Sequence, residues 1–139
     1  MSKPEIRAVL DTSVVIRLLT GHPSDLAQAA RVYLAETEQS GSKVYVSNLV
    51  IMEAYFACQH HYKMPKADVL QGLHTLLAIP TFVVHPQLLT LLSTEGLATA
   101  QPGFLDRLIH AEARSAHLPL VTFEKAAARL ADTQISKAE

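Results

Sequence analysis

The chain has 139 residues, of which 49% are hydrophobic and 18% are charged, and it contains no low-complexity segment. This length and composition exclude a disordered chain and favour one globular domain with a single hydrophobic core. The formal net charge of -1, from 12 Lys and Arg against 13 Asp and Glu, excludes a general basic surface for nucleic acid, so any polynucleotide contact has to be local or metal-assisted.

Short apolar runs alternate along the chain with longer segments of helical periodicity. This alternation predicts an α/β domain with a central, mainly parallel sheet of four to five short strands flanked by helices. The strands are expected near 6–10, 43–46, 81–84 and 120–123, and the helices near 14–20, 24–39, 49–62, 66–78, 86–99, 104–116 and 125–131. We expect one domain over residues 1–131, followed by a flexible C-terminal tail over 132–139.

Cysteine usage and hydropathy indicate the compartment. The single Cys58 excludes an internal disulfide and a cysteine zinc site, and the N-terminus lacks the basic-then-apolar pattern of a signal peptide. No apolar run approaches the roughly 18 residues that would span a membrane. We therefore expect a cytoplasmic protein without membrane contact.

Two carboxylates directly follow predicted strands. Asp11 follows the first strand and Glu124 follows the strand at 120–123. Ligands of open parallel sheets bind beyond the carboxyl ends of the strands, so both acids are candidates for a binding site. Helix capping explains either residue alone equally well.

Two further carboxylates lie inside apolar helical segments. Glu53 interrupts an apolar stripe that contains Leu49 and Phe56, and Asp106 falls in the first turn of the helix after Pro102. A lone buried Glu would be costly, although pairing with a basic side chain or a backbone group would lower that cost. The helix dipole alone can account for Asp106.

Together the four acids suggest a cation site. Two carboxylates about 4 Å apart repel by roughly 4 kcal/mol at an effective dielectric near 20, so such a cluster needs cations or protons. The seven histidines show no metal-binding spacing, and oxygen ligands alone favour Mg²⁺ or Mn²⁺ over zinc. Ions of this kind activate water and stabilise a leaving oxygen, which suggests phosphodiester hydrolysis.

The four segments that carry these acids resemble the signature blocks of PIN domains, in order and over nearly the whole chain. They are Leu10-Asp11-Thr12-Ser13, Ser47 followed six positions later by Glu53, Gly103-Phe104-Leu105-Asp106-Arg107-Leu108-Ile109 and Val121-Thr122-Phe123-Glu124. In size the chain resembles the VapC-type toxin ribonucleases. The resemblance implies a PIN-like three-layer sandwich, Mg²⁺ or Mn²⁺ held by the four acids, cleavage of single-stranded RNA, a homodimer and a small antitoxin protein as partner.

The resemblance also assigns individual residues. Asp11, Glu53 and Asp106 match the family's catalytic and metal-binding acids, while Ser13 and Thr122 match the small hydroxyls that support such a site. Three positions depart from the family pattern. They are Glu124 in place of the usual Asp, Gly103 where relatives often carry an acid, and Arg107 where a small residue commonly follows the acid. Arg107 would either hold a phosphate or pair with a site carboxylate and compete with metal.

Basic and aromatic side chains supply candidate RNA contacts. Arg17, Arg107 and Lys125 are candidates for phosphate contacts, with ordinary solvated surface as the alternative. Tyr55, Phe56 and Tyr62 either stack on bases or pack in the core or in a dimer. The leucines between 69 and 97 belong either to the core or to a homodimer face.

The leading hypothesis is a metal-dependent endoribonuclease, the toxin of a type II toxin–antitoxin pair. Its alternative is a PIN-like RNA- or protein-binding module with weak or no nuclease activity, which the departures at Glu124 and Arg107 would explain.

Overall fold

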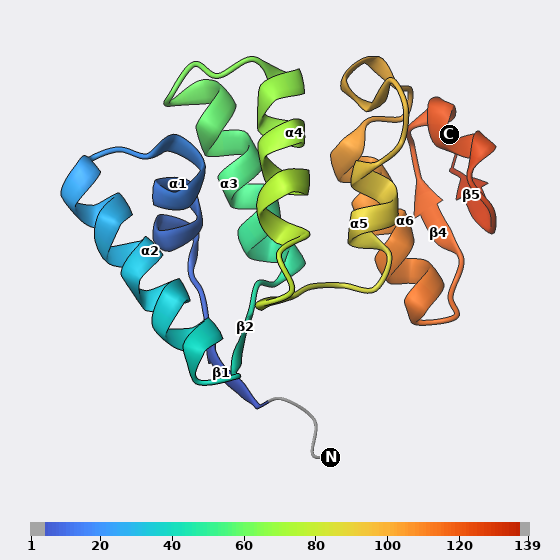
Figure 1. The fold of residues 1–139 in the computed structure, drawn as a ribbon. Coiled ribbons are helices and arrows are strands. Elements are labelled where there is room, and N and C mark those ends of the chain that lie inside the picture. Colours follow the sequence, from blue (N-terminus) through green and yellow to red (C-terminus); the bar gives the residue numbers. More distant parts are fainter. Residues whose placement is uncertain (1–4, 137–139) are drawn as a thin grey trace. The chain divides into compact units, whose positions relative to one another are not determined.

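The computed structural model describes residues 5–136, which form two compact units divided between Leu89 and Thr90 (Figure 1). In chain order the elements are β1 (Ile6–Val9), α1 (Thr12–Thr20), α2 (Ser24–Gln39), β2 (Lys43–Tyr45), α3 (Asn48–His60), α4 (Lys66–Leu77), β3 (Phe82–Val83), α5 (Leu88–Leu92), η1 (Leu97–Thr99), α6 (Phe104–Ser115), β4 (Leu120–Thr122), η2 (Lys125–Arg129) and β5 (Thr133–Ile135), where η1 and η2 are short 3-10 helices. Of the helices that the structure describes, none combines the length and the apolar character needed to cross a lipid bilayer.

Unit 1 contains a three-stranded parallel sheet in the order β1-β2-β3. Val9 lies opposite Tyr45, and Tyr45 lies opposite Val83. Each pair of consecutive strands is connected through two helices, as parallel strands require a crossover. The fold class predicted from the alternating pattern, α/β with parallel strands flanked by helices, is confirmed.

The core of unit 1 explains why these segments take these positions. Val44 and Val46 of the β2 segment are fully buried, as is Ile51 of α3, and Val15 of α1 and Leu73 of α4 are buried with them. Burying a side chain of this size contributes about 1.5–3 kcal/mol relative to leaving it exposed. These side chains hold the helices that carry Asp11 and Glu53 in fixed positions.

Local capping sets the limits of α1 and α3. Asp11 is the N-cap of α1 and accepts a hydrogen bond from the amide of Val14, while Ser47 caps α3 in the same way through the amide of Val50. Helix α1 ends at Gly21, whose φ of 70° is left-handed and favours glycine. Both cap residues are typical of helix N-termini.

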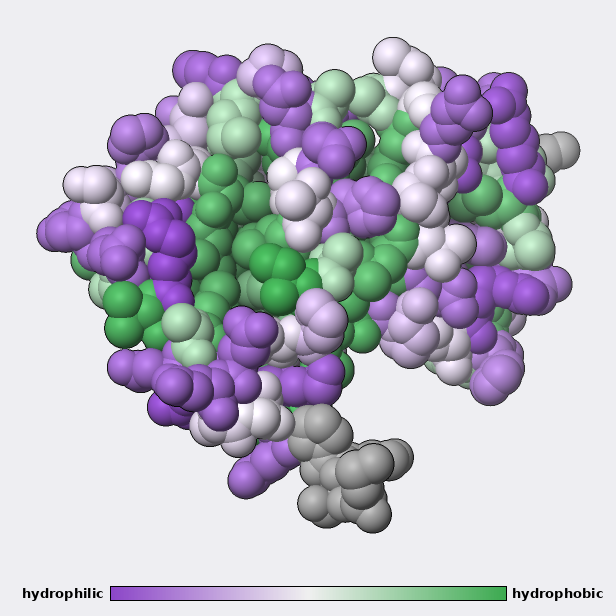
Figure 2. Space-filling model, viewed as in Figure 1, coloured by the Kyte–Doolittle hydropathy of each residue, from purple (hydrophilic) through white to green (hydrophobic). Residues whose placement is uncertain are grey.

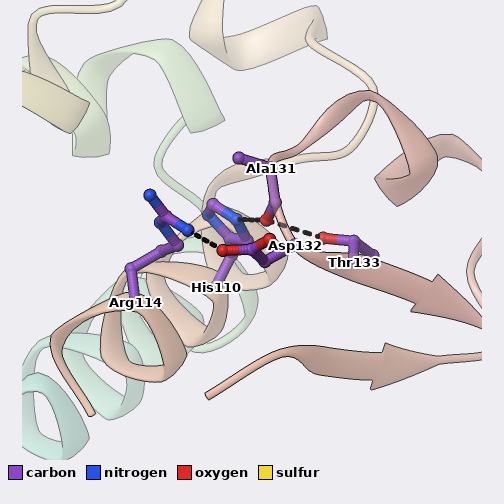
Figure 3. A network of polar contacts seen from close by, with 5 residues as sticks. All are labelled: His110, Arg114, Ala131, Asp132 and Thr133. Carbon is purple, nitrogen blue, oxygen red and sulfur yellow. Dashed lines mark hydrogen bonds and ion pairs between the residues drawn. The ribbon is translucent and has the colours of Figure 1, made fainter. Parts of the chain in front are cut away.

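Unit 2 contains α6 and a two-stranded parallel sheet of β4 and β5, with Val121 opposite Gln134. Phe104, Leu108 and Ala111, spaced at one helical face of α6, are buried. Figure 3 shows how the chain before β5 is attached to α6: His110 Nε2 lies 2.6 Å from the carbonyl oxygen of Ala131, and Arg114 forms an ion pair with Asp132.

Three segments differ from the sequence prediction. The helix expected over 86–99 is divided into α5 and η1, because Gly96 adopts a left-handed φ of 70° and the Ser93 hydroxyl donates to the Thr90 carbonyl at 2.7 Å. The last predicted helix, 125–131, is the 3-10 helix η2. The tail expected over 132–139 contains β5, which pairs with β4, and its last three residues lie outside the described part of the chain.

Candidate metal-binding and nuclease site

Asp11 lies immediately beyond β1, at the carboxyl end of the unit 1 sheet. Its Oδ1 accepts hydrogen bonds from the Ser13 hydroxyl at 2.6 Å and from the Val14 amide at 3.3 Å. These bonds, the Ser13 hydroxyl first, lower the pKa of the Asp11 carboxyl below its ordinary value. Asp11 is therefore an ionised, solvent-exposed carboxylate at neutral pH.

Glu53 is attached to the same region through Thr12. The Thr12 hydroxyl donates to Glu53 Oε2 at 3.1 Å, and Thr12 is the residue that follows Asp11 in the chain. The carboxylates of Asp11 and Glu53 thus each accept a hydrogen bond from a hydroxyl at the start of α1. The sequence did not indicate Thr12 as a partner of Glu53, because the two residues are 41 positions apart.

The stripe around Glu53 is exposed, so the alternative of a partly buried Glu does not apply. Leu49 is 67% exposed and Phe56 is 54% exposed, whereas Tyr55 on the other side of α3 is 6% exposed. Helix α3 is apolar on both sides, so the sequence pattern alone could not indicate which side faces the core.

Unit 2 carries the other two acids on separate elements. Asp106 is half-buried in the first turn of α6, where the helix N-terminus favours a negative charge. Glu124 is exposed and caps η2, with its Oε1 accepting a hydrogen bond from the Ala126 amide at 3.2 Å. The Thr122 hydroxyl accepts a hydrogen bond from the Glu124 amide at 3.0 Å.

The predicted phosphate contacts have different local partners. Arg17 Nη1 donates to the Tyr62 hydroxyl at 2.9 Å, and Arg107 Nε donates to the Pro102 carbonyl at 2.7 Å. Within the described part of unit 2, no acid forms an ion pair with Arg107. Lys125 is exposed at the start of η2.

A hollow of about 420 Å³ lies beside Asp11 in unit 1, between β1, α1 and α2. Its wall is largely apolar and includes Val9, Leu26 and Tyr33, together with Ser13 and Arg17. Figure 2 shows hydrophobic residues gathered beside α2 on the face that it draws. The hydroxyl that lowers the pKa of Asp11 thus belongs to a residue of this wall.

The donor chemistry of unit 1 fits a hard divalent cation. Among residues 5–136, neither unit contains a group of three His, Cys, Asp or Glu side chains placed to bind one metal ion. Mg²⁺ is commonly held through one or two carboxylates while it keeps several waters, and Mn²⁺ also accepts carboxylate and water ligands. Asp11 and Glu53 are both exposed, and each accepts a hydrogen bond from a hydroxyl of α1, so unit 1 offers two such carboxylates.

Comparison with known proteins identifies the family. The family model of the PIN domain matches residues 8–133. The chain belongs to the PIN domain family. The match runs from the end of β1 to the start of β5 and includes all four predicted acids.

One curated relative of this PIN domain chain is described as a VapC ribonuclease, from Aquifex aeolicus (strain VF5). It is 29% identical over 77 residues, which cover 55% of this chain and 56% of the relative. The chain thus spans about half the length of that relative. No solved structure matches this chain.

Proposed function

We propose that this PIN domain protein is an endoribonuclease that hydrolyses RNA phosphodiester bonds with the help of Mg²⁺ or Mn²⁺. The observation that carries the proposal is that Asp11 and Glu53 each accept a hydrogen bond from a hydroxyl at the start of α1, beyond the carboxyl end of β1. The PIN family match and the relative named as a ribonuclease support the same activity.

In this proposal the metal ligands are Asp11, Glu53, Asp106 and Glu124. A bound Mg²⁺ or Mn²⁺ would supply Lewis-acid stabilisation of the phosphodiester and lower the pKa of a water molecule. Ser13 lowers the pKa of Asp11 and so favours its ionised form, and Thr12 fixes the orientation of Glu53. Thr122 holds the backbone of Glu124.

Arg17, Arg107 and Lys125 remain the proposed phosphate contacts. Arg107 uses its Nε for the Pro102 carbonyl. This bond orients the guanidinium group, whose remaining N–H groups suit a phosphate oxygen. Lys125 is exposed and directly follows Glu124 in the chain, so it offers a positive charge next to that acid.

The proposed biological role is that of the toxin in a type II toxin–antitoxin pair, acting in the cytoplasm as a homodimer and held inactive by a small antitoxin protein. The support for this role is the relative described as VapC ribonuclease. Controlled expression of the chain in a bacterial host should arrest growth, and Asp11→Asn should remove that effect. Growth arrest that persists at full strength with Asp11→Asn would contradict a toxic nuclease activity.

The nuclease activity is tested with purified protein and labelled single-stranded RNA and DNA of the same sequence. RNA should be cleaved only with Mg²⁺ or Mn²⁺, and Asp11→Asn should abolish cleavage while the melting temperature stays close to that of the parent. Asp25→Asn is a matched control, because Asp25 is an exposed acid in the first turn of α2 and is not a proposed ligand. Equal cleavage by both variants would refute the proposed site.

The Arg107 and Glu124 departures favour one alternative, an RNA- or protein-binding module with weak or no nuclease activity. A titration with Mn²⁺ separates the two functions. A working metal site raises the melting temperature in a concentration-dependent way by mass action, and a binding module without that site does not show the shift.

A further inference from the structure

The exposed face of α3 carries an unusual series of side chains. Leu49, Glu53, Phe56 and His60 follow one another at intervals of four, three and four residues, so they lie on one helical face, and all four are exposed. Ile51, Ala54, Tyr55 and Cys58, which lie between them in the sequence, are buried in the core of unit 1. A Phe that is 54% exposed stands one helical turn from a proposed metal ligand.

The Phe56 ring is held in place by a neighbouring ring. Its centroid lies 4.2 Å from that of the His60 imidazole, with an interplanar angle of 38°. The contact restricts the rotamer of Phe56, while more than half of the residue remains open to solvent. An exposed ring that is already oriented loses less side-chain entropy when a second flat group stacks on it.

The position of Glu53 within this face indicates which flat group fits. An interface with a second protein copy would bury the carboxylate between Leu49 and Phe56, and burial of an unpaired charge is costly. A nucleotide avoids this cost, since its base needs only the ring surface and the carboxylate stays free for a hydrated cation. Side chains three residues apart on a helix have Cβ atoms about 5–6 Å apart, which is compatible with one nucleotide reaching both groups.

We propose that Phe56, oriented by His60, stacks on a base of single-stranded RNA next to the phosphate that lies at Glu53. This inference rests on the proposed nuclease function. Stacking of a base on an aromatic side chain tolerates any base, because every base has a π face. Phe56 would thus position the strand for cleavage without selecting a sequence.

The chain contains no tryptophan, so a single introduced tryptophan reports stacking without background. Phe56→Trp should lose fluorescence in a saturable manner when oligouridine or oligoadenine is mixed in rapidly with Mg²⁺ and the emission is read before cleavage proceeds. Val32→Trp is the control, because Val32 is an exposed apolar residue of α2. Equal quenching of both variants, or quenching of neither, would overturn the proposal.

Kinetics separate positioning from chemistry. Phe56→Ala should raise KM for single-stranded RNA roughly tenfold with kcat changed less than about twofold, and Phe56→Tyr should restore KM. An unchanged KM in Phe56→Ala with normal cleavage would overturn stacking and leave the nuclease assignment intact. Quenching of Phe56→Trp by RNA in a protein that cleaves nothing would support stacking and refute the nuclease.

A second copy of the protein could instead cover the exposed face of α3, and Phe56→Trp also tests this alternative. If Phe56→Trp emission changes with protein concentration alone, and sedimentation shows a dimer over the same range, a second copy covers the ring and the RNA proposal fails. Emission that is independent of protein concentration supports it.

Discussion

Thr12 donates its hydroxyl hydrogen to Oε2 of Glu53 at 3.1 Å and so connects the first turn of α1 with the middle of α3. Thr12→Val keeps the shape of the side chain and removes this bond. Because Glu53 then loses its fixed orientation, we expect Mn²⁺ affinity to fall several-fold, with a loss of stability of no more than about 1.5 kcal/mol. Calorimetric titration with Mn²⁺ and a thermal melt measure the two effects.

Thr12→Ser is the matched variant, since it retains the hydroxyl. It should bind Mn²⁺ with nearly the parent affinity. If Thr12→Val and Thr12→Ser bind the ion equally well, the hydrogen bond has no part in metal binding.

Ser13→Ala should raise the pKa of Asp11 toward its ordinary value of 3.8, because it removes the largest cause of the lowered pKa. A carboxyl with a lowered folded pKa contributes stability that is fully present above its unfolded pKa and is lost as pH falls through the folded pKa. In Ser13→Ala this contribution is smaller at neutral pH, and Asp11 becomes protonated at a higher pH during acid titration. Carboxyl NMR titration measures the shift, and Ser13→Thr should preserve the low pKa.

Glu124→Asp should retain or increase RNA cleavage. The Glu124 carboxylate caps η2 through the Ala126 amide, and Asp is among the best residues for such a cap. Cleavage rates at saturating Mg²⁺ decide the matter, with Glu124→Gln as the variant that keeps the length and removes the charge. A large loss of activity in Glu124→Asp would show that the site depends on the longer side chain.

Ile51→Ala should destabilise the protein by about 2–5 kcal/mol, since Ile51 is fully buried and its truncation leaves a cavity. Leu49→Ala, two residues earlier and 67% exposed, should change stability by no more than about 0.5 kcal/mol. Urea unfolding of both variants gives the comparison. Similar losses in the two variants would mean that the exposed face of α3 is covered in solution.

The sheet of unit 1 could be predicted because its signals are local. The apolar runs at β1 and β2 are short and bounded by polar residues, and Asp11 and Ser47 are recognisable N-caps. The division of 86–99 into two helices was missed because the leucines of α5 and Leu97 fit one helical pattern. The left-handed φ of Gly96, which lies between them, ends that pattern. Strand β5 was missed because two of its three residues, Thr133 and Gln134, are polar, so it lacks the apolar run that marks the other strands.

The sequence indicated where the four candidate acids lie along the chain and did not indicate their contacts. Asp11 and Glu124 follow strands, and the sequence shows this directly. The hydrogen bond between Thr12 and Glu53 joins residues 41 positions apart, so no local sequence pattern predicts it. Whether Asp11, Glu53, Asp106 and Glu124 bind one cation stays a prediction, which the Mn²⁺ titrations address.

Strand β5 matters for anyone who shortens this protein. A chain cut after residue 131, where the sequence pattern suggests that the domain ends, would lose the strand that pairs with β4. The freed amide and carbonyl groups of β4 would then lie beside the exposed side chains of Val121 and Phe123. An unpaired apolar edge of this kind is a template for intermolecular strand pairing, so the shortened protein should aggregate where the longer one stays dispersed.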